Sequence, residues 1–417
     1  MVPPPALEPN QNPMRWLIAE DALRDRKGHW FDYLTTFRNG LIEVGDRVEI
    51  LVDRQATPDV NRRLNANPIL PKSIWSRMSD GAGPLTRFAR VPLHALATKR
   101  AVADWFRHNA SPDVVFVPTV LVHHLLGWTW LLNGLLRHSS ARVILFFPNT
   151  PIRLSSANGS PEWNRAPTAI LFRRLVHSLR TLVVAGRVVL GTETLPMRDA
   201  LTRLTGVPFT YLPHPVASSR EPGPPAASPD ESGLVMGSFG SARLEKGSDL
   251  LAAAVLDYCR RHPDSRVRFA LQCVEGREKD WHPLQAQSRI NLIQDYFAEG
   301  EYARQLHSTQ ILLLPYRRAS YDLRVSRMVI EALIAGMPVV ATRGTTLACQ
   351  AEEFGAIVHC EDGDAPSLYE AICKAETSYP ELHTRAAERS HLARQHFSVR
   401  NFRELFLATA LASTGNH

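Results

Sequence analysis

Two segments in the second half of the chain combine glycines with charged side chains. The first, residues 237–247, reads GSFGSARLEKG and contains the cations Arg243 and Lys246. It follows an apolar run and precedes a helical pattern that begins at Ser248. A strand-to-helix turn directs backbone N–H groups and the positive end of the helix dipole at one place, so we expect an anion to bind there.

The second segment carries a carboxylate on a predicted helix. Residues 321–341 read YDLRVSRMVIEALIAGMPVVA, with Glu331 inside the helix and Gly336 at its end. A buried strand is predicted directly after the glycine. Together, the two segments indicate a site for a nucleotide diphosphate.

Each charged residue also has an ordinary structural interpretation. Arg243 and Lys246 are compatible with solvated cations ahead of a helix, and Glu331 with an acid on a helix surface. The glycines around the cations and the sequence GMPVV after the acidic helix favour a binding site. Those glycines are Gly237, Gly240 and Gly247.

Length and charge limit the class of protein. A chain of 417 residues is long enough for two domains with separate hydrophobic cores. The formal net charge of +7 fits an anionic substrate, an anionic membrane surface or nucleic acid. Because the cations are scattered rather than massed with aromatic residues, we expect no nucleic-acid partner.

Other features of the composition predict a cytoplasmic protein. The proline-rich residues 1–13 show no secretory signal pattern and are expected to be a disordered lead-in. The longest apolar stretch, 120–136, is interrupted by polar residues and falls short of a membrane-spanning helix. The five cysteines lack the spacing of metal ligands, so we expect reduced thiols.

Predicted strands and helices alternate along both halves. In the first half, strands are expected at 15–19, 48–52, 114–117, 143–147 and 188–191, and helices at 30–44, 120–136 and 166–179. In the second half, strands are expected at 234–239, 267–273, 290–294, 311–315, 338–342 and 356–359, and helices at 248–261, 299–308 and 325–335. Three further helical patterns start at Ala365, Leu382 and Val399. This alternation predicts an α/β protein with parallel sheets covered on both faces.

A proline-rich linker separates the two halves. Residues 216–233 contain four prolines among small and acidic residues. The predicted parts are therefore an N-terminal domain over 14–215, a C-terminal domain over 234–381, and terminal helices over 382–417. Open parallel sheets bind ligands outside the carboxyl ends of their strands. We thus expect two doubly wound, Rossmann-like domains that face each other across a cleft.

The charged segments resemble motifs of a known enzyme family. GSFGSARLEKG and EALIAGMPVV are similar, in content and order, to donor-domain motifs of GT-B glycosyltransferases of the retaining family 4. The first half is similar to the acceptor domain of that family, with Gly28 and His29 in the loop after the first strand. The resemblance runs from about Arg15 to the C-terminus. It implies a GT-B fold whose last helix returns to the N-terminal domain.

The resemblance also implies roles on the donor side. In the family, the cations of the first segment stabilise the departing diphosphate, which would be the catalytic role of Arg243 and Lys246 beside Gly240. The family glutamate contacts the ribose hydroxyls, which assigns that contact to Glu331. A nucleotide sugar is the expected co-substrate, with no metal and no other cofactor.

On the acceptor side, the resemblance points to Gly28, His29, His123 and Asn149. His29 is also a catalytic candidate, and a loop histidine without function is its alternative. His123 belongs to a histidine pair like one seen in relatives, although the apolar setting favours packing for at least one of the two. Asn149 follows a predicted strand at a place where many relatives have a histidine near the reacting sugar.

Two further positions depart from the family pattern. The first of the two family glutamates is replaced by Leu323. A subset of relatives has Tyr-x-x-Arg-x-Ser-Gly instead, which Tyr321, Arg324 and Ser326 match as donor-binding candidates. Arg327 replaces the final glycine, where it would either add a phosphate contact or block the site.

The implied function is transfer of a sugar from a nucleotide-diphosphate sugar to a hydroxyl acceptor, a glycan or a lipid-linked one. The expected setting is bacterial polysaccharide or glycolipid assembly. Two alternatives stay open: a catalytically degenerate GT-B protein that binds nucleotide or glycan as a partner subunit, and a sugar-nucleotide epimerase.

A basic helix in the first half suggests a peripheral membrane contact. Residues 170–182 place cations on one side and leucines on the other. The cations are Arg173, Arg174, His177 and Arg180. Such a face suits anionic headgroups at the inner face of a membrane, and a solvated surface helix is the alternative.

Overall fold

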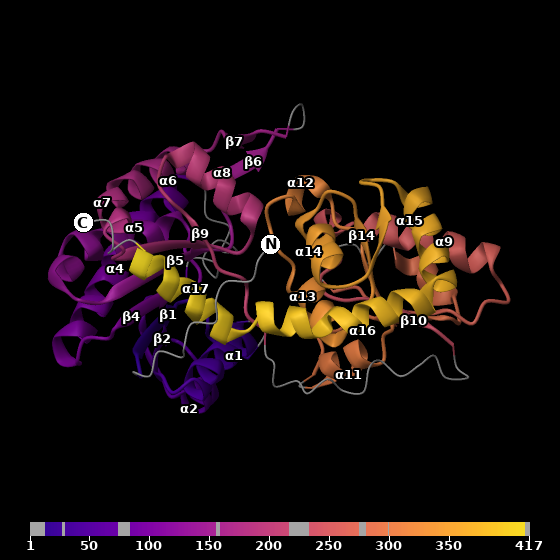
Figure 1. Ribbon diagram of the computed structural model, residues 1–417, viewed down its shortest axis with the longest axis horizontal. Coiled ribbons are helices and arrows are strands. Elements are labelled where there is room, and N and C mark those ends of the chain that lie inside the picture. Colours follow the sequence, from indigo (N-terminus) through magenta and orange to yellow (C-terminus); the bar gives the residue numbers. More distant parts are fainter. Residues whose placement is uncertain are drawn as a thin grey trace.

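The structure, a computed structural model, describes residues 13–26, 30–73, 84–155, 159–216, 233–274, 281–298 and 300–412. Two β-sheets lie in separate halves of the molecule, and helices flank each of them (Figure 1). Central strands such as β4 (Val114–Val117) and β13 (Ile311–Leu314) are apolar and buried at every position. Burial on both faces explains why these strands read as continuous hydrophobic runs.

The first sheet is built by the N-terminal half. Within the described residues it has seven parallel strands in the order β3-β2-β1-β4-β5-β8-β9. Its other strands are β1 (Arg15–Glu20), β2 (Arg47–Asp53), β3 (Ala66–Leu70), β5 (Arg142–Phe147), β8 (Val188–Thr192) and β9 (Thr210–Tyr211). The helices of this half are α1 (Trp30–Glu43), α2 (Pro58–Leu64), α4 (Pro84–His108), α5 (Val122–Asn133), η1 (Leu135–His138), α6 (Pro167–Ser178), α7 (Arg180–Val184) and α8 (Leu195–Thr205).

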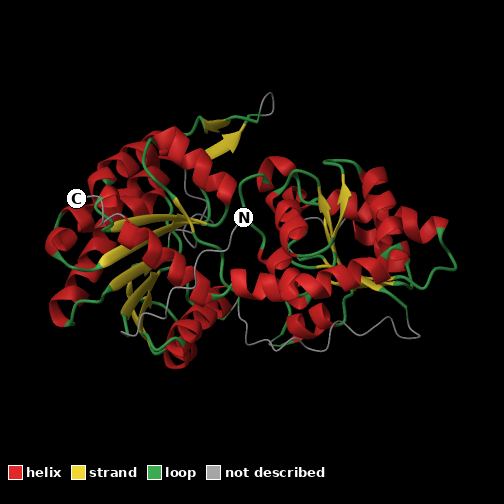
Figure 2. Ribbon diagram, in the orientation of Figure 1, coloured by secondary structure: helices red, strands yellow, loops and turns green. Residues whose placement is uncertain are grey.

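A small antiparallel hairpin extends from the first half. Its strands are β6 (Ile152–Leu154) and β7 (Pro161–Trp163), and it stands apart from the main sheet at the top of the view (Figure 2).

The second sheet, again counting described residues, has six parallel strands in the order β12-β11-β10-β13-β14-β15. Its remaining strands are β10 (Val235–Ser238), β11 (Arg268–Gln272), β12 (Ile290–Ile293), β14 (Val339–Thr342) and β15 (Ile357–Cys360). Its helices are η2 (Leu244–Lys246), α9 (Ser248–Arg261), η3 (His282–Ala286), α11 (Glu301–His307), α12 (Arg318–Tyr321), α13 (Arg327–Ala335), α14 (Thr346–Phe354) and α15 (Ala365–Thr377).

Each sheet contains a point where the strand order reverses. In the first sheet this point lies between β1 and β4, and in the second it lies between β10 and β13. Loops that leave the carboxyl ends of two such strands diverge to opposite faces and open a crevice for ligands. The reversal points therefore mark where sites are expected in both halves.

The last two helices connect the halves. α16 (Tyr379–His396) packs on α13 and α14, whereas α17 (Val399–Ala412) packs on α1 (Figure 1). Phe406 meets the Trp16 ring at 5.7 Å between centroids, and the buried Arg403 Nε donates to Asp46 Oδ2 at 2.7 Å. The domain boundary placed after residue 381 from sequence falls inside α16.

The predicted fold class is confirmed: two Rossmann-like domains with parallel sheets. The expected helix over 120–136 is shorter: α5 covers Val122–Asn133, Gly134 caps it, and the chain then forms η1. The predicted lead-in, except residue 13, and nearly all of the predicted linker lie outside the described residues. Where the chain is described, no helix has both the length and the apolarity needed to cross a membrane.

Candidate functional site

The loop after β10 brings Lys246 back over a glycine. Gly240 has φ +105°, and its N–H donates to the side-chain oxygen of Gln272 at 2.7 Å. A Cβ at position 240 would lie 2.9 Å from Lys246 Nζ. The absence of a side chain at Gly240 therefore leaves room for the lysine ammonium beside the end of β10.

Gly247 holds the same loop against the neighbouring strand. Its φ is +67°, and a Cβ there would lie 2.0 Å from the backbone oxygen of Pro315, just after β13. Neither the conformation nor the approach tolerates a side chain, since the clash is with backbone. The glycine thus positions Lys246 and the start of α9 at the reversal point of the second sheet.

Side chains from the second segment meet the first segment here. Lys246 Nζ lies 5.7 Å from the centroid of the Tyr316 ring, and Arg324 Cζ lies 5.1 Å from that of Tyr321. The two tyrosine rings are 4.6 Å apart. Glu245 lies between the cations, 3.7 Å from an Arg243 nitrogen and 4.0 Å from one of Arg324.

The charges in this group leave it positive. Three cations, Arg243, Lys246 and Arg324, face one carboxylate, Glu245. Burial lowers the pKa of Lys246, and the neighbouring Arg243 and Arg324 add to the effect. Burial and the neighbouring cations destabilise the charged form of Lys246. A bound phosphate would stabilise that form, because its negative charge offsets the neighbouring positive charges.

Tyr316 and Tyr321 are neutral donors in this setting. Burial raises the pKa of each to about 12. Both phenols therefore keep their protons throughout the physiological range and can donate hydrogen bonds. Ser326, the third residue of the Tyr-x-x-Arg-x-Ser pattern, interacts with the buried Tyr316 hydroxyl.

Glu331 lies on α13 with both carboxylate oxygens engaged. Oε1 accepts a hydrogen bond from Arg327 Nε at 2.9 Å, and Oε2 accepts one from the Tyr302 hydroxyl. Arg327 also lies 3.9 Å from Asp32 of α1, across the boundary between the two halves. Arg327 is thus drawn to two carboxylates, and ribose hydroxyls would have to share or displace its bond to Glu331.

Leu323, which replaces a family glutamate, belongs to the contact between the halves. Its side chain is buried within the apolar cluster of the first half. Its carbonyl oxygen accepts a hydrogen bond of 2.6 Å from the Thr194 hydroxyl, at the start of α8. The position therefore attaches the second segment to the N-terminal domain.

The structure describes two of the four acceptor-side candidates, His123 and Asn149. His123 sits in the first turn of α5 and is buried against His94 and His124. Asn149 follows β5 and is half-buried. Gly28 and His29 lie outside the described residues, so their predicted roles stay predictions.

The structure adds residues that the sequence patterns did not single out. Gln272 ends β11 and anchors Gly240, and a polar residue at the carboxyl end of a buried strand was a signal for it. Tyr302 and Asp21 gave no comparable signal, because their partners lie 29 and 103 residues away.

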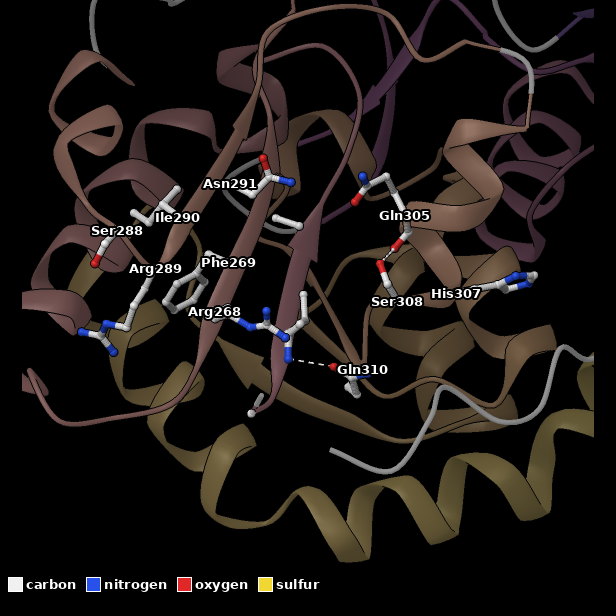
Figure 3. A pocket seen from close by; sticks show the side chains of 13 residues that line it. Arg268, Phe269, Ser288, Arg289, Ile290, Asn291, Gln305, His307, Ser308 and Gln310 are labelled. Atoms are coloured by element: carbon white, nitrogen blue, oxygen red, sulfur yellow. Dashed lines mark hydrogen bonds between the residues drawn. The ribbon is translucent and has the colours of Figure 1, made fainter. Parts of the chain in front are cut away.

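A separate pocket of about 600 Å³ lies at the amino ends of the second sheet's strands. Arg268, Asn291, Gln305 and Gln310 are among the residues that line it (Figure 3). The Gly240–Lys246 loop leaves the carboxyl end of β10, so this pocket is not part of the candidate site.

Comparisons with known proteins identify the fold. No family model and no curated protein matches the chain. Among solved structures, a glycosyltransferase from Rickettsia africae is 12% identical, covers 97% of this chain and 100% of its own, and has a TM-score of 0.66. Anabaena HepE in complex with UDP and glucose is 13% identical, with coverages of 96% and 100% and a TM-score of 0.60. The trehalose 6-phosphate synthase of Burkholderia multivorans is 12% identical, with coverages of 97% and 98% and a TM-score of 0.64. Over nearly its whole length, therefore, this chain has the GT-B fold of glycosyltransferases.

Proposed function

We propose that the protein is a retaining glycosyltransferase that moves a sugar from a nucleoside-diphosphate sugar to a hydroxyl acceptor. The observation that carries this proposal is the group of three cations around Gly240 and Glu245, at the strand-order reversal of the second sheet. A diphosphate fits there because the three cations lie beside the start of α9, where the helix dipole is positive.

The transfer needs charge stabilisation more than it needs a base. The bond between the anomeric carbon and the diphosphate oxygen breaks, so negative charge grows on the leaving nucleoside diphosphate. Lys246 and Arg243 would stabilise that charge, as fixed donors do for other developing anions. The acceptor oxygen then bonds to the anomeric carbon on the same face, and its proton passes to the leaving phosphate.

A screen of nucleotides tests the proposal directly. The thermal unfolding of the full-length protein is measured with UDP, GDP, ADP and TDP, and then with their sugars. HepE was solved with UDP and glucose, so UDP and UDP-glucose are the first probes. We expect one nucleoside diphosphate to raise Tm, since a ligand at 100 times its Kd stabilises by about 2.7 kcal/mol. If none of the four nucleoside diphosphates raises Tm, the proposal is wrong.

The bonds between Arg327, Tyr302 and Glu331 favour a second candidate. Both oxygens of Glu331 already accept hydrogen bonds, so the carboxylate is less free to bind ribose hydroxyls. Such a weakened donor site is expected of a catalytically degenerate subunit that binds nucleotide or glycan. The two candidates differ in turnover. Release of nucleoside diphosphate from the stabilising sugar nucleotide, in the presence of hydroxyl acceptors, supports the enzyme, whereas stabilisation without release supports the binding subunit.

Closure of the two halves on the donor is a further prediction. Thr194 and Arg327 bond across the boundary, so the halves already touch at the edge of the proposed site. We expect small-angle scattering to show a smaller radius of gyration with saturating nucleotide, because closure brings the two halves together. Closure would also exclude water from the activated sugar. An unchanged radius at saturation would argue for a rigid protein.

A lipid-linked acceptor would require a membrane-facing surface, and α6 with the start of α7 offers one. Arg173, Arg174 and Arg180 are exposed, beside an Ile170 that is 61% exposed. Leu175 is buried on the opposite side. The two arginines of α6 and its exposed isoleucine also line a pocket of about 650 Å³ that extends to Trp163.

Liposome co-sedimentation tests this surface. Binding should rise with the fraction of anionic lipid, fall with salt, and disappear when Arg173, Arg174 and Arg180 are changed to Glu. Reversal of exposed cations in the second domain, Arg260 and Lys374, is the matched control and should leave binding in place. Wild type that stays in the supernatant at low salt would point to a soluble glycan acceptor.

A further inference from the structure

Three histidines and one aspartate meet inside the N-terminal domain. His94 belongs to α4, His123 and His124 begin α5, and Asp21 follows β1. All four are buried, with exposed fractions of 3% to 7%. The proposed transfer gives none of these four an established task, although His123 was a candidate on the acceptor side.

The three imidazoles lie close together, and Asp21 contacts two of them. Asp21 Oδ2 lies 2.8 Å from His94 Nε2 and 3.0 Å from His124 Nε2. One nitrogen from each of the three imidazoles lies within 4.8 Å of the others. Ligand atoms around a tetrahedral zinc ion, at bond lengths of about 2.0–2.1 Å, are about 3.4 Å apart. Binding an ion would therefore bring the imidazole nitrogens closer together and move Asp21 Oδ2 slightly away from His94 and His124, which it now contacts at hydrogen-bond distance.

Three buried polar atoms of the cluster lack a hydrogen-bond partner. Within the part of the chain that is described, His94 Nδ1, His123 Nε2 and Asp21 Oδ1 have no hydrogen-bond partner. The contacts between Asp21 Oδ2 and the Nε2 atoms of His94 and His124 satisfy none of these three atoms. A metal ion would use the lone pair of His123, because a neutral imidazole nitrogen is a metal ligand.

The cluster lies beside the contact between α4 and α5. A Cβ at Gly127 of α5 would lie 3.0 Å from the backbone oxygen of Ala95. The glycine allows α5 to approach α4 beside His94, which brings that histidine to the pair on the first turn of α5. Asp21 reaches the same place because β1 and β4 are neighbours in the sheet.

We propose that Asp21, His94, His123 and His124 bind one divalent transition-metal ion, for which Zn²⁺ is the best match. Imidazole and carboxylate ligands suit this ion, and four protein ligands make a closed, structural site. The ion would join α4, α5 and the loop after β1 at the reversal point of the first sheet. The site is independent of the diphosphate chemistry proposed above.

The test uses full-length, tag-free protein stripped of metal by a chelator. After dialysis against Zn²⁺ or Co²⁺, we expect about one equivalent to be retained by elemental analysis. The Co²⁺ form should show the intense visible absorption of tetrahedral cobalt, and Zn²⁺ should raise Tm by mass action. His94→Gln and His123→Gln should each weaken metal binding at least about tenfold. His391→Ala, an exposed histidine on α16, is the matched control and should bind as wild type.

Three results would overturn the proposal. They are the absence of stoichiometric metal on wild type, a cobalt spectrum of octahedral, water-bound ions, and unchanged binding in both glutamine variants. Circular dichroism establishes whether each variant is folded. If a variant is not folded, the stoichiometry and cobalt spectrum of wild type decide the question by themselves.

Discussion

Lys246→Ala is expected to lower kcat/KM for the sugar nucleotide by about 10²–10³-fold, while the protein stays folded. The expected loss is that of one preorganised donor at a developing anion, about 2.7–4 kcal/mol. Lys246 is the half-buried cation at Gly240. Removing a charge whose burial lowers its own pKa also relieves desolvation, so stability should not fall. Steady-state kinetics and thermal unfolding of the same preparation measure both effects.

Two companion variants make this result specific. Lys374→Ala removes an exposed lysine on α15 and should leave kcat/KM unchanged. Arg243→Glu reverses the more exposed cation, whose side chain is 55% exposed, and should abolish turnover by placing a carboxylate beside the phosphates. If both Lys246→Ala and Arg243→Glu keep wild-type affinity for the nucleoside diphosphate, the assignment of the phosphate site is wrong.

Glu331→Ala should weaken binding of the ribose nucleotide by about 1.5–3 kcal/mol, the range for a hydrogen bond to a charged group. The corresponding 2′-deoxy nucleotide should bind equally to wild type and variant, if the contact is to the 2′-hydroxyl. Isothermal titration of four combinations, two proteins and two nucleotides, isolates the coupling between the carboxylate and that hydroxyl.

Glu331 also bonds to Arg327 and Tyr302, so Glu331→Ala could change stability as well as nucleotide binding, and both must be controlled. Removing the carboxylate leaves the half-buried Arg327 without its closest partner, so the free energy of unfolding of Glu331→Ala must be measured as well. Glu370→Ala changes an exposed acid on α15 and should affect neither binding nor stability. Equal losses for ribose and deoxyribose nucleotides would indicate a fold defect or a different contact.

Local patterns in the sequence were sufficient for much of the fold. The helix expected at 248–261 and the strand expected at 114–117 have the observed bounds, because each side-chain periodicity is a property of a few consecutive residues. The phosphate-site prediction rests on the same kind of information. Gly240 and Gly247 lie within seven residues of Lys246, so the turn and the cation are encoded together.

Other elements were missed for a physical reason. The edge strand β3 (Ala66–Leu70) contains a proline and two exposed residues, and its apolar pattern is correspondingly weak. The short helix α2 (Pro58–Leu64) is fixed by the Thr57 cap and by packing of two side chains, which a periodicity over seven residues barely registers. Such elements are stabilised by neighbours more than by their own pattern.

By itself, the sequence determined the alternation of strands and helices, the positions of the glycine turns and the candidate diphosphate segment, because all of these depend on residues close along the chain. Only the tertiary structure decided that Leu323 attaches to Thr194, that Arg327 faces Asp32 as well as Glu331, and that Asp21 meets three histidines. The Thr194 and Asp21 contacts join residues about 70 to 130 positions apart. The Asp21 contacts exist because the order of strands in the first sheet, which no local pattern specifies, places β1 beside β4. The Thr194 contact exists because the two domains pack against each other.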